Sequence, residues 1–283
     1  MTYLENLSIY IVYAAVVLAY IWIAKKWRDV ATRKFDDDKE IEQNGNMAVG
    51  LRRFGLYLGL AIGMSAALTG ETLGFVNDLK TLAIEGALVL VMMMLSRFFN
   101  DAIILHGINN DDEAQAGNTA VGLVEAGSYI ATGLIMFGAF SGGGGTVLQG
   151  YLSAMLFAVL GQVSLLIFFQ AYEFVTSFNV REEVKAANPA AGLAVGCMLV
   201  ALGVLLRASI AGDFQGWMVD IKSFALSTAN GILLLLIFRK VIDWLFLPNT
   251  TLRVEVEKKR NVAAVAVTQA CILALAIIIA GVI

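Results

Sequence analysis

Long apolar stretches dominate the chain, and the short segments between them carry most of the charge. A membrane-spanning helix needs about 20 mainly apolar residues, because the hydrocarbon core is about 30 Å thick and each residue adds about 1.5 Å. Each such stretch is expected to be a helix, since a lone strand would leave its backbone polar groups unpaired in lipid. The stretches that qualify are residues 7–24, 47–68, 82–99, 119–140, 150–172, 189–211, 222–246 and 262–283.

The composition points to the same class of protein. Of the 283 residues, 59% are hydrophobic and 15% are charged, whereas a soluble domain has about 45–50% apolar and about 25% charged residues. The 20 Lys and Arg against 23 Asp and Glu leave no basic excess for nucleic-acid binding. The pattern therefore predicts an all-α integral membrane protein with eight transmembrane helices, which binds no nucleic acid.

The distribution of basic residues predicts the orientation in the membrane. Of the 20 Lys and Arg, all but Lys80, Arg207 and Lys222 fall on the side that holds the segments after the first, third, fifth and seventh spans. Basic residues accumulate on the cytoplasmic side of membrane proteins. We therefore expect these segments in the cytoplasm and both termini on the other side.

An internal repeat is the main feature of the sequence. Four similar segments open the even-numbered spans, and their asparagines are 72, 70 and 73 residues apart. The repeating unit is then a helical hairpin, and because it contains two spans, every copy crosses the membrane in the same direction. Such parallel repeats predict four hairpins with pseudo-symmetry about the membrane normal. The segments are Asn46-Met-Ala-Val-Gly, Asn118-Thr-Ala-Val-Gly, Asn188-Pro-Ala-Ala-Gly and Asn261-Val-Ala-Ala-Val.

The chain is expected to divide into two halves at the uncharged run Ser141–Gly145. A glycine run of this kind is typical of a flexible link. The first double hairpin would comprise residues 1–143 and the second residues 144–283, with four spans in each.

The repeated asparagines are expected to cap their helices. An asparagine side chain at this position accepts hydrogen bonds from the free N–H groups of the first helical turn. A role in ligand binding is the alternative. The asparagines in question are Asn46, Asn118, Asn188 and Asn261.

The even-numbered spans are rich in small residues, which allow membrane helices to approach closely. Gly55, Gly59 and Gly63 lie on one face of the second span, and glycines or alanines recur in the other three. We therefore expect the even-numbered helices to form an inner cluster and the bulkier odd-numbered helices to face lipid.

Ionisable side chains inside a membrane span are costly and indicate a possible functional site. Glu125 lies seven residues after Asn118, and Arg53 lies seven residues after Asn46. Repeat symmetry would place these two at one depth, where they could form a buried ion pair that fixes helix register. The alternative is a proton or ion path that uses Glu125 with Gln162 or Gln269.

Basic residues at the cytoplasmic rim are candidates for contact with anionic lipid headgroups. They are Lys25, Lys26, Arg239 and Lys240. The chain offers no nucleophile elbow, phosphate-binding glycine loop or zinc-binding helix motif. We therefore expect no cofactor, no metal and no enzymatic activity.

The charged loop followed by Asn-x-Ala-x-Gly, repeated about every 70 residues, resembles the YjfL-like family of bacterial inner-membrane proteins, a domain of unknown function. The chain looks like two tandem copies of that domain, although Val265 replaces the glycine of the motif in the last repeat. The resemblance implies the bacterial cytoplasmic membrane and a helical fold, and it hints at envelope homeostasis. With the orientation predicted from the basic residues, both termini are then expected in the periplasm. It implies no established activity and no site residues.

Two functional hypotheses follow. The first is a non-enzymatic membrane protein that organises the membrane, or takes part in envelope stress, and docks soluble partners on its charged cytoplasmic loops. The second is an ion or proton channel, or a small-solute transporter, with a path between the even-numbered helices near Glu125. The sequence leaves the oligomeric state and the identity of any protein partner open.

Overall fold

The computed structural model describes residues 3–32, 34–69, 72, 74–143, 146–176 and 178–283. This part of the chain is helical and contains no strand. Eight of its helices are long and apolar enough to cross a membrane, so the predicted number of spans is confirmed. They are α1 (Tyr3–Ala31), α3 (Met47–Ser65), α4 (Phe75–Phe99), α6 (Thr119–Phe140), α7 (Val147–Val175), α9 (Pro189–Ile210), α10 (Trp217–Phe246) and α11 (Val262–Ala280).

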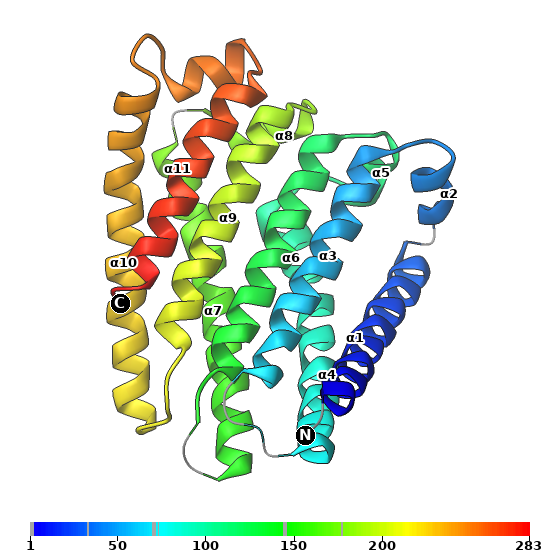
Figure 1. Ribbon diagram of the computed structural model, residues 1–283. Helices are drawn as coiled ribbons and strands as arrows, with labels where there is room; N and C mark the ends of the chain where they lie inside the picture. The colour runs from blue at the N-terminus through cyan, green and yellow to red at the C-terminus, as the bar shows by residue number, and fades with distance from the viewer. Residues whose placement is uncertain (1–2, 33, 70–71, 73, 144–145, 177) are drawn as a thin grey trace.

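We call α3, α6, α9 and α11 the inner helices, and α1, α4, α7 and α10 the outer helices. A short helical segment joins each outer helix to the next inner helix at one end of the bundle (Figure 1). We call this the capped end. The segments are α2 (Asp37–Glu42), α5 (Asn110–Gln115), α8 (Val180–Lys185) and the π-helical turn η3 (Val254–Lys258).

The other connections lie at the opposite end. The 3-10 turn η1 (Ala66–Leu68) extends α3 there. The glycine run expected to link the two halves lies only partly within the described residues, because residues 144 and 145 are outside them. The flanking Gly143 accepts a backbone hydrogen bond from Phe214 at 2.8 Å, which ties this connection to the segment between α9 and α10.

A second π-helical turn joins the two halves at the capped end. This turn, η2 (Asn100–Ile104), continues α4. Arg181 of α8 donates hydrogen bonds to the carbonyl oxygens of Ile103 and Ile104, at 2.9 and 3.3 Å. A side chain of the second half therefore satisfies carbonyl groups at the end of an outer helix of the first half.

The inner helices lie side by side in a row, in the order α3, α6, α9, α11 (Figure 1). All four begin at the capped end and run in the same direction, and α3 and α11 form the two ends of the row. The sequence analysis expected four hairpins with pseudo-symmetry about the membrane normal. The inner helices lie in a row instead and do not surround a common central axis.

The positions of the contact faces explain the row. In the junctions α3–α6 and α6–α9, the earlier helix contacts the later one with residues two, nine and thirteen positions after its asparagine. The later helix contributes the residues four, eight and fifteen positions after its own asparagine. At about 100° per residue these faces are about 140° apart. Four helices closed into a square would need faces about 90° apart, so the helices stack in line instead.

Glycine allows the inner helices to meet backbone to backbone. A Cβ atom added to Gly55 would lie 2.3 Å from the Ala126 Cα, and one added to Gly127 would lie 2.3 Å from the Gly196 carbonyl oxygen. The close approach predicted from the small residues is therefore present between α3 and α6 and between α6 and α9. These two junctions place α6 and α9 deepest in the protein.

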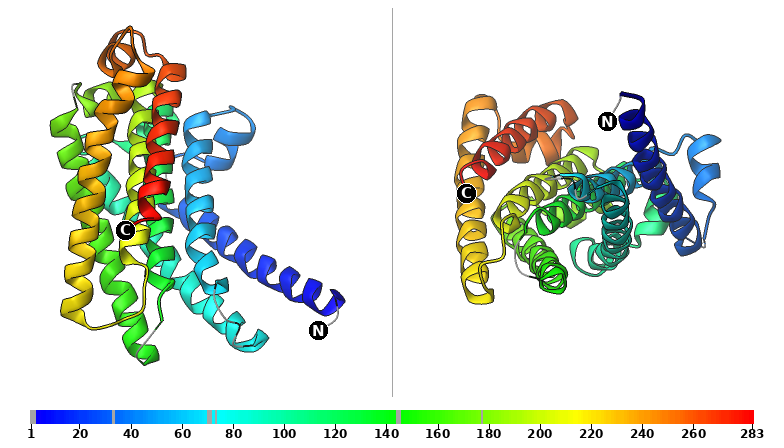
Figure 2. Two further views of the ribbon diagram at one scale, coloured as in Figure 1. Left: turned by 60° about the vertical axis from the view of Figure 1, so that its left-hand side comes forward. Right: turned by 60° about the horizontal axis from the view of Figure 1, so that its bottom comes forward.

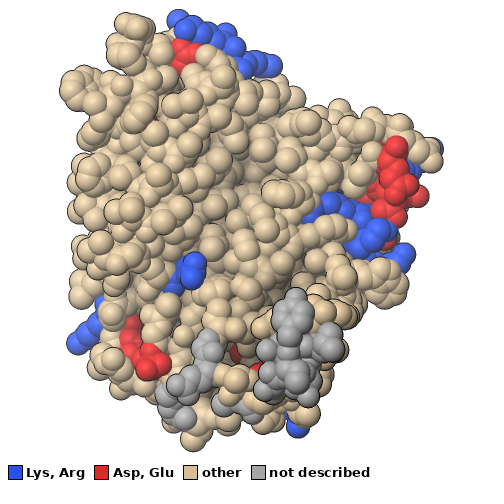
Figure 3. All heavy atoms as spheres, in the orientation of Figure 1, with Lys and Arg blue, Asp and Glu red and all other residues tan. Residues whose placement is uncertain are grey.

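The outer helices present large apolar side chains to the surroundings, as expected for lipid-facing helices. α1 is the most exposed, and its N-terminal part diverges from α3 (Figure 2). Tyr10, Leu18 and Trp22 on this helix are 64%, 64% and 60% exposed. The space-filling view shows a broad uncharged surface below the basic side chains that lie over η3 (Figure 3).

Candidate functional site

A cluster of buried charged side chains lies where α1, α3, α4, α5 and α6 meet at the capped end. We call it the arginine cluster. Each side chain stands near the end of its element, so the meeting of these ends brings together residues far apart in the sequence. The members are Arg28 of α1, Arg52 of α3, Arg97 of α4, Asp111 of α5 and Glu125 of α6.

The Asp111 carboxylate is the centre of the arginine cluster. Its Oδ1 atom lies 3.1 Å from Nη2 of Arg28 and 3.1 Å from Nη2 of Arg52, and its Oδ2 atom lies 2.8 Å from Nη2 of Arg97. The Arg28 and Arg52 side chains are 0% and 1% exposed. A buried charge is costly unless it is paired and hydrogen-bonded, so one carboxylate on a six-residue helix helps to neutralise arginines from three spans.

Arg52 also pairs with Glu125, and both side chains are 1% exposed. The Arg52 Nε donates to the Glu125 carboxylate, and its Nη2 donates to the Asn110 carbonyl oxygen at 3.1 Å. The sequence analysis expected Arg53 in this place. Successive helix residues point about 100° apart, so only one of two adjacent arginines can face α6.

Arg53 instead faces α1 and α2, where it pairs with Asp29, Asp37 and Asp38. Its Nε lies 3.2 Å from the Asp37 carboxylate, and its Nη1 lies 3.3 Å from that of Asp38. Burial raises the pKa of the Asp37 carboxyl, whereas a hydrogen bond from Lys25 lowers the pKa of Asp38. Arg53 therefore belongs to a second, more peripheral group of charges that holds α2 against α3.

Several polar atoms of the arginine cluster, and one of the neighbouring residue Tyr129, have no hydrogen-bond partner among the described residues. They are Nε and Nη1 of Arg28, Nη1 of Arg52, Oε1 of Glu125 and the hydroxyl of Tyr129, all of them buried. Buried polar groups in proteins are normally satisfied by protein atoms or ordered water. The arrangement supplies both donors and acceptors in one place, so it can bind water or a small polar group as well as hold the helices together.

The two glutamines that the sequence analysis grouped with Glu125 lie elsewhere. Gln162 of α7 donates to the Thr132 hydroxyl at 2.9 Å, and Thr132 donates in turn to Ser96 at 2.8 Å. Gln269 of α11 is buried, and its amide has no partner among the described residues. The structure therefore does not bring Arg53, Glu125, Gln162 and Gln269 into one site.

The four repeated asparagines occupy the N-cap positions of the inner helices. Each side-chain oxygen accepts from one or two backbone N–H groups of the first turn. Each side-chain amide also donates to a glutamate that lies five or six residues earlier, at 2.7 to 3.2 Å. The pairs are Glu40–Asn46, Glu113–Asn118, Glu183–Asn188 and Glu255–Asn261.

Three of these amides form a further bond to the next unit in the row. Each donates to a backbone carbonyl of the following short segment, at 2.9, 2.9 and 2.8 Å. The bonds run from Asn46 to Ala114, from Asn118 to Val184 and from Asn188 to Val256. The repeated asparagines thus connect neighbouring inner helices as well as capping their own.

The rim residues expected to contact lipid headgroups differ in their availability. Lys26 is 54% exposed and Lys240 is exposed as well. Lys25 pairs with Asp29 and Asp38, and the guanidinium of Arg239 is buried over the ring of a tyrosine, Tyr172, 4.5 Å from its centroid. Of these four, only Lys26 and Lys240 are exposed to the surroundings, and the Nζ atom of Lys26 also lies 3.8 Å from the Asp29 carboxylate.

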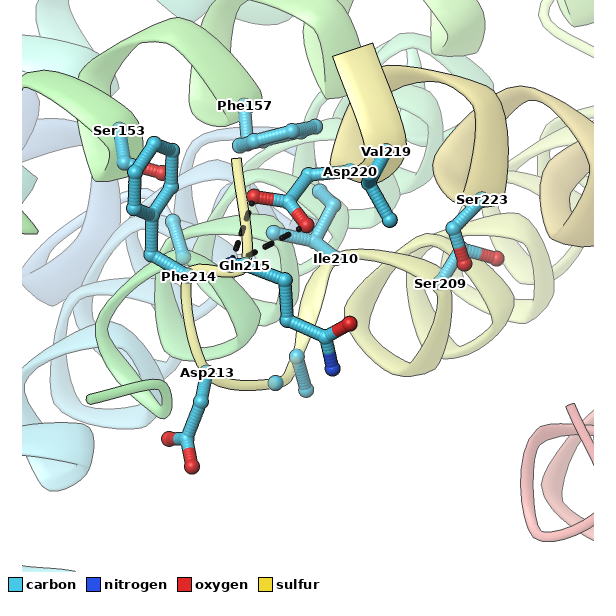
Figure 4. Close-up of a pocket in the computed structure, with 13 residues that line it drawn as sticks. Ser153, Phe157, Ser209, Ile210, Asp213, Phe214, Gln215, Val219, Asp220 and Ser223 are labelled. Carbon is cyan, nitrogen blue, oxygen red and sulfur yellow. Dashed lines mark hydrogen bonds between the residues drawn. The ribbon is translucent and has the colours of Figure 1, made fainter. Parts of the chain in front are cut away.

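A polar cavity of about 190 Å³ lies at the opposite end, between α6, α7, α9 and α10 (Figure 4). The Asp220 carboxylate at its wall accepts from the backbone N–H groups of Gln215 and Gly216, both at 3.2 Å. Asp213 accepts from the Gly143 N–H at 2.8 Å. Both acidic groups therefore hold the loop before α10 in place.

Comparison with known proteins identifies the family. A family described as a domain of unknown function, DUF350, matches this chain twice, over residues 1–140 and 146–283. The chain belongs to this family. The YjfL-like resemblance is confirmed only to this extent, as two copies of a domain of unknown function. Each match covers two of the helical hairpins.

A relative of this DUF350 protein supports the assignment to membranes. The UPF0719 transmembrane protein of Aquifex aeolicus (strain VF5) is 27% identical over 242 residues, which cover 85% of this chain and 87% of the relative. No solved structure matches the chain. The protein is therefore a multi-pass transmembrane protein of unknown function.

The sequence analysis missed Arg28, Arg52 and Asp111, the core of the arginine cluster. Nothing in their spacing marks them, because they lie in three separate elements. It also missed the glutamate partners of the asparagines. Their signal was present, since a glutamate followed by an apolar residue precedes each asparagine, as in Glu113-Ala114 and Glu183-Val184.

Proposed function

We propose that this protein is a non-enzymatic protein of the bacterial cytoplasmic membrane, which organises the membrane, as in envelope stress, and docks a soluble partner at its capped end. The partner would carry an acidic surface. The capped end would face the cytoplasm and both termini the periplasm, because the Lys and Arg of the described part of the chain, except Lys80, Arg207 and Lys222, lie toward the capped end. The four hairpins would be copies of one unit, related by pseudo-symmetry.

The observation that supports docking is that the two halves differ in how their basic side chains are placed at the capped end. In the first half, Arg28, Arg52 and Arg53 are buried and paired within the chain. In the second half, Lys258 of η3 and Arg260, which follows this turn, are exposed, and basic side chains gather over this part of the capped end (Figure 3). Exposed charge of one sign attracts partners of opposite charge.

A pull-down from membranes solubilised in mild detergent tests the docking role. We expect one soluble acidic protein to come down with the wild-type chain and to be lost with a variant that combines Lys240→Gln, Lys258→Gln and Arg260→Gln. The control combines Lys80→Gln and Lys222→Gln on exposed lysines of the opposite end. Recovery of the same proteins with all three chains, or of none, would remove the basis for this role.

Anionic lipid is the other source of negative charge at this end. Native mass spectrometry of the wild-type chain and of a variant that combines Lys26→Gln and Lys240→Gln would show whether phosphatidylglycerol binding depends on these two exposed rim lysines. Loss of bound lipid together with loss of the protein partner would indicate that headgroups complete the docking surface.

A channel or transporter remains the second candidate, and the buried Arg52–Glu125 pair is the observation that favours it. Against it, α3 and α6 meet backbone to backbone at Gly55 and Gly59, just below this pair. Flux of several ions into liposomes, compared between the wild-type chain and Glu125→Gln, tests this candidate. Flux that needs Glu125 would favour a transport role over docking.

A further inference from the structure

The row of inner helices is built from one interface that is used repeatedly. We call the residues two, nine and thirteen positions after each asparagine the forward face, and those four, eight and fifteen positions after it the back face. The forward face of α3 meets the back face of α6: a Cβ atom added to Gly122 would lie 2.6 Å from the Ala48 carbonyl oxygen. The forward face of α6 meets the back face of α9 in the same way, with 2.4 Å between a Cβ added to Gly192 and the Ala120 Cα.

The last inner helix follows the same pattern on one side. On the back face of α11, Val265, Gln269 and Ala276 are buried, and the helix packs against α9. The amide of Asn188 bonds to the Val256 carbonyl across this junction. The three successive junctions therefore share an asparagine bond at the capped end, and the first two also share a backbone contact of small residues below it.

The forward face of α11 has no neighbouring inner helix in the part of the chain that the structure describes. It consists of Ala263, Ala270 and Ala274, which are all exposed. The amide of Asn261 donates to Glu255, but it bonds to no carbonyl of a following unit among the described residues. Alanine side chains make few packing contacts with lipid because they are small. Small side chains do allow another helix to approach closely.

The back face of α3, at the other end of the row, is also open. A Cβ atom added to Gly50 would meet nothing within 4 Å, and the Phe54 side chain is 56% exposed. The carbonyl that corresponds to those of Ala114, Val184 and Val256 belongs to Ile41, because it directly follows the glutamate Glu40. The backbone hydrogen bonds around α2 do not use this carbonyl.

The outer helices give an independent reason to expect a neighbour here. Each of α4, α7 and α10 packs against its own inner helix and against the one before it: α6 and α3, α9 and α6, α11 and α9. α1 packs against α3 and α4 but has no preceding inner helix in this chain. An apolar hollow of about 510 Å³ borders it, lined by Tyr10, Tyr13, Ala14, Val17, Leu18 and Leu68.

We propose that two copies of this chain associate head to tail, with α11 of one copy packed against α3 and α1 of the next. Ala263 would then lie against Gly50, Ala270 would lie under the Phe54 ring, and the Asn261 amide would donate to the Ile41 carbonyl. The new junction repeats the three internal ones, so it continues the row across two molecules. An interface between different faces closes into a ring or runs on into a longer assembly.

Disulfide cross-linking in native membranes tests this contact. In a background with Cys197→Ala and Cys271→Ala, one tagged chain carries Gly50→Cys and a second, differently tagged chain carries Ala263→Cys. The corresponding internal positions touch, because a Cβ atom added to Gly122 would lie 2.9 Å from the Ala48 Cα. Such close contact brings two cysteines within reach of a disulfide, whose Cβ atoms are about 3.5–4.5 Å apart. We expect a cross-linked dimer with both tags. The matched control replaces Ala263→Cys by Val241→Cys, which is exposed near the capped end of α10.

Equal cross-linking with the Val241→Cys control would mean random collision, and no cross-linking with Ala263→Cys would mean that α11 faces lipid. Either result would overturn the proposal.

A second variant, Ala270→Trp, adds bulk to an exposed position and so should leave the monomer folded. We expect it to lower the cross-linked fraction about tenfold and to shift the mass in nanodiscs toward one copy. Ile237→Trp on the exposed surface of α10 should do neither. A wild-type chain that is monomeric in native membranes and nanodiscs would refute the assembly.

Discussion

Arg52 donates its Nε hydrogen to the Glu125 carboxylate across the junction of α3 and α6, and both side chains are 1% exposed. The same guanidinium reaches Asp111 at 3.1 Å, so this one residue connects α3 to α5 and to α6. The pair lies beside the first backbone contact between two inner helices. It therefore fixes both the rotation and the depth of these helices.

Breaking this pair should destabilise the protein more than removing it entirely. Glu125→Gln leaves a buried guanidinium without its main counter-charge, a change that typically costs about 3–5 kcal/mol. The double variant Arg52→Gln, Glu125→Gln removes both charges, and we expect it to recover part of the loss. Thermal unfolding of the two single variants and the double variant in one detergent gives the coupling energy. Purely additive effects would show that the two side chains do not interact.

Replacing an asparagine that connects two inner helices should lower the free energy of unfolding more than replacing Asn261, the asparagine of the last inner helix. Asn118→Ala removes an N-cap, which is worth about 0.5–2 kcal/mol, and leaves the Val184 carbonyl unpaired for about 1–3 kcal/mol more. Asn261→Ala removes a cap but no bond to a following unit of its own chain. The comparison is made by unfolding monomeric protein in detergent, and equal losses would contradict the proposed link between units.

The glycine contacts predict a position-dependent response to alanine. At Gly127 a Cβ atom would lie 2.3 Å from the backbone of Gly196, so Gly127→Ala must push α6 and α9 apart and lower stability by several kcal/mol. At Gly150 of α7 a Cβ atom meets nothing within 4 Å, and Gly150→Ala should be neutral or stabilising by up to about 1 kcal/mol. Melting temperatures of the two variants decide the point; similar values would mean that the helices do not meet as described.

The residue before each asparagine has a left-handed backbone conformation. Two of these four residues are glycines, and the other two carry a side chain, which makes this conformation unfavourable. φ is +61° at Gly45 and +82° at Gly117, but it is also positive at Ala187 (53°) and Arg260 (49°). A left-handed conformation costs an L-residue about 1–2 kcal/mol. Ala187→Gly should therefore stabilise the protein by up to about 1 kcal/mol, and Gly117→Ala should destabilise it. Unfolding of both variants tests this, and a lower stability of Ala187→Gly would refute the explanation.

Glu255 should make stability depend on pH in a defined window. Hydrogen bonds from Lys259 and Asn261 lower the pKa of its carboxyl from 4.5 to about 2. A carboxyl with a lowered pKa stabilises the folded state fully above its unfolded pKa and loses this effect as the pH falls through the folded pKa. The melting-temperature difference between the wild-type chain and Glu255→Gln should therefore be constant above pH 5 and should vanish between about pH 4.5 and 2. A difference that persists at pH 2 would contradict this origin.

The sequence by itself determined the features that depend on local chemistry. Apolar length defined the eight helices that can cross a membrane, because hydrocarbon thickness sets that length. The asparagines marked the starts of the inner helices, because a cap acts on its own first turn. Glycine spacing marked the faces of close approach, because side-chain size limits helix separation at any junction.

Only the tertiary structure decided how these elements meet. Arg52 and Arg53 are adjacent and chemically identical, and the rotation of α3 against α6 selects which of them reaches Glu125. The Asp111 contacts with three arginines require that the ends of α1 and α4 and the starts of α3 and α5 lie at the same level. The tertiary structure also decided that the four inner helices form a row and not a ring. Helix order and rotation result from many weak packing contacts summed over whole faces, and no short segment of sequence encodes that sum.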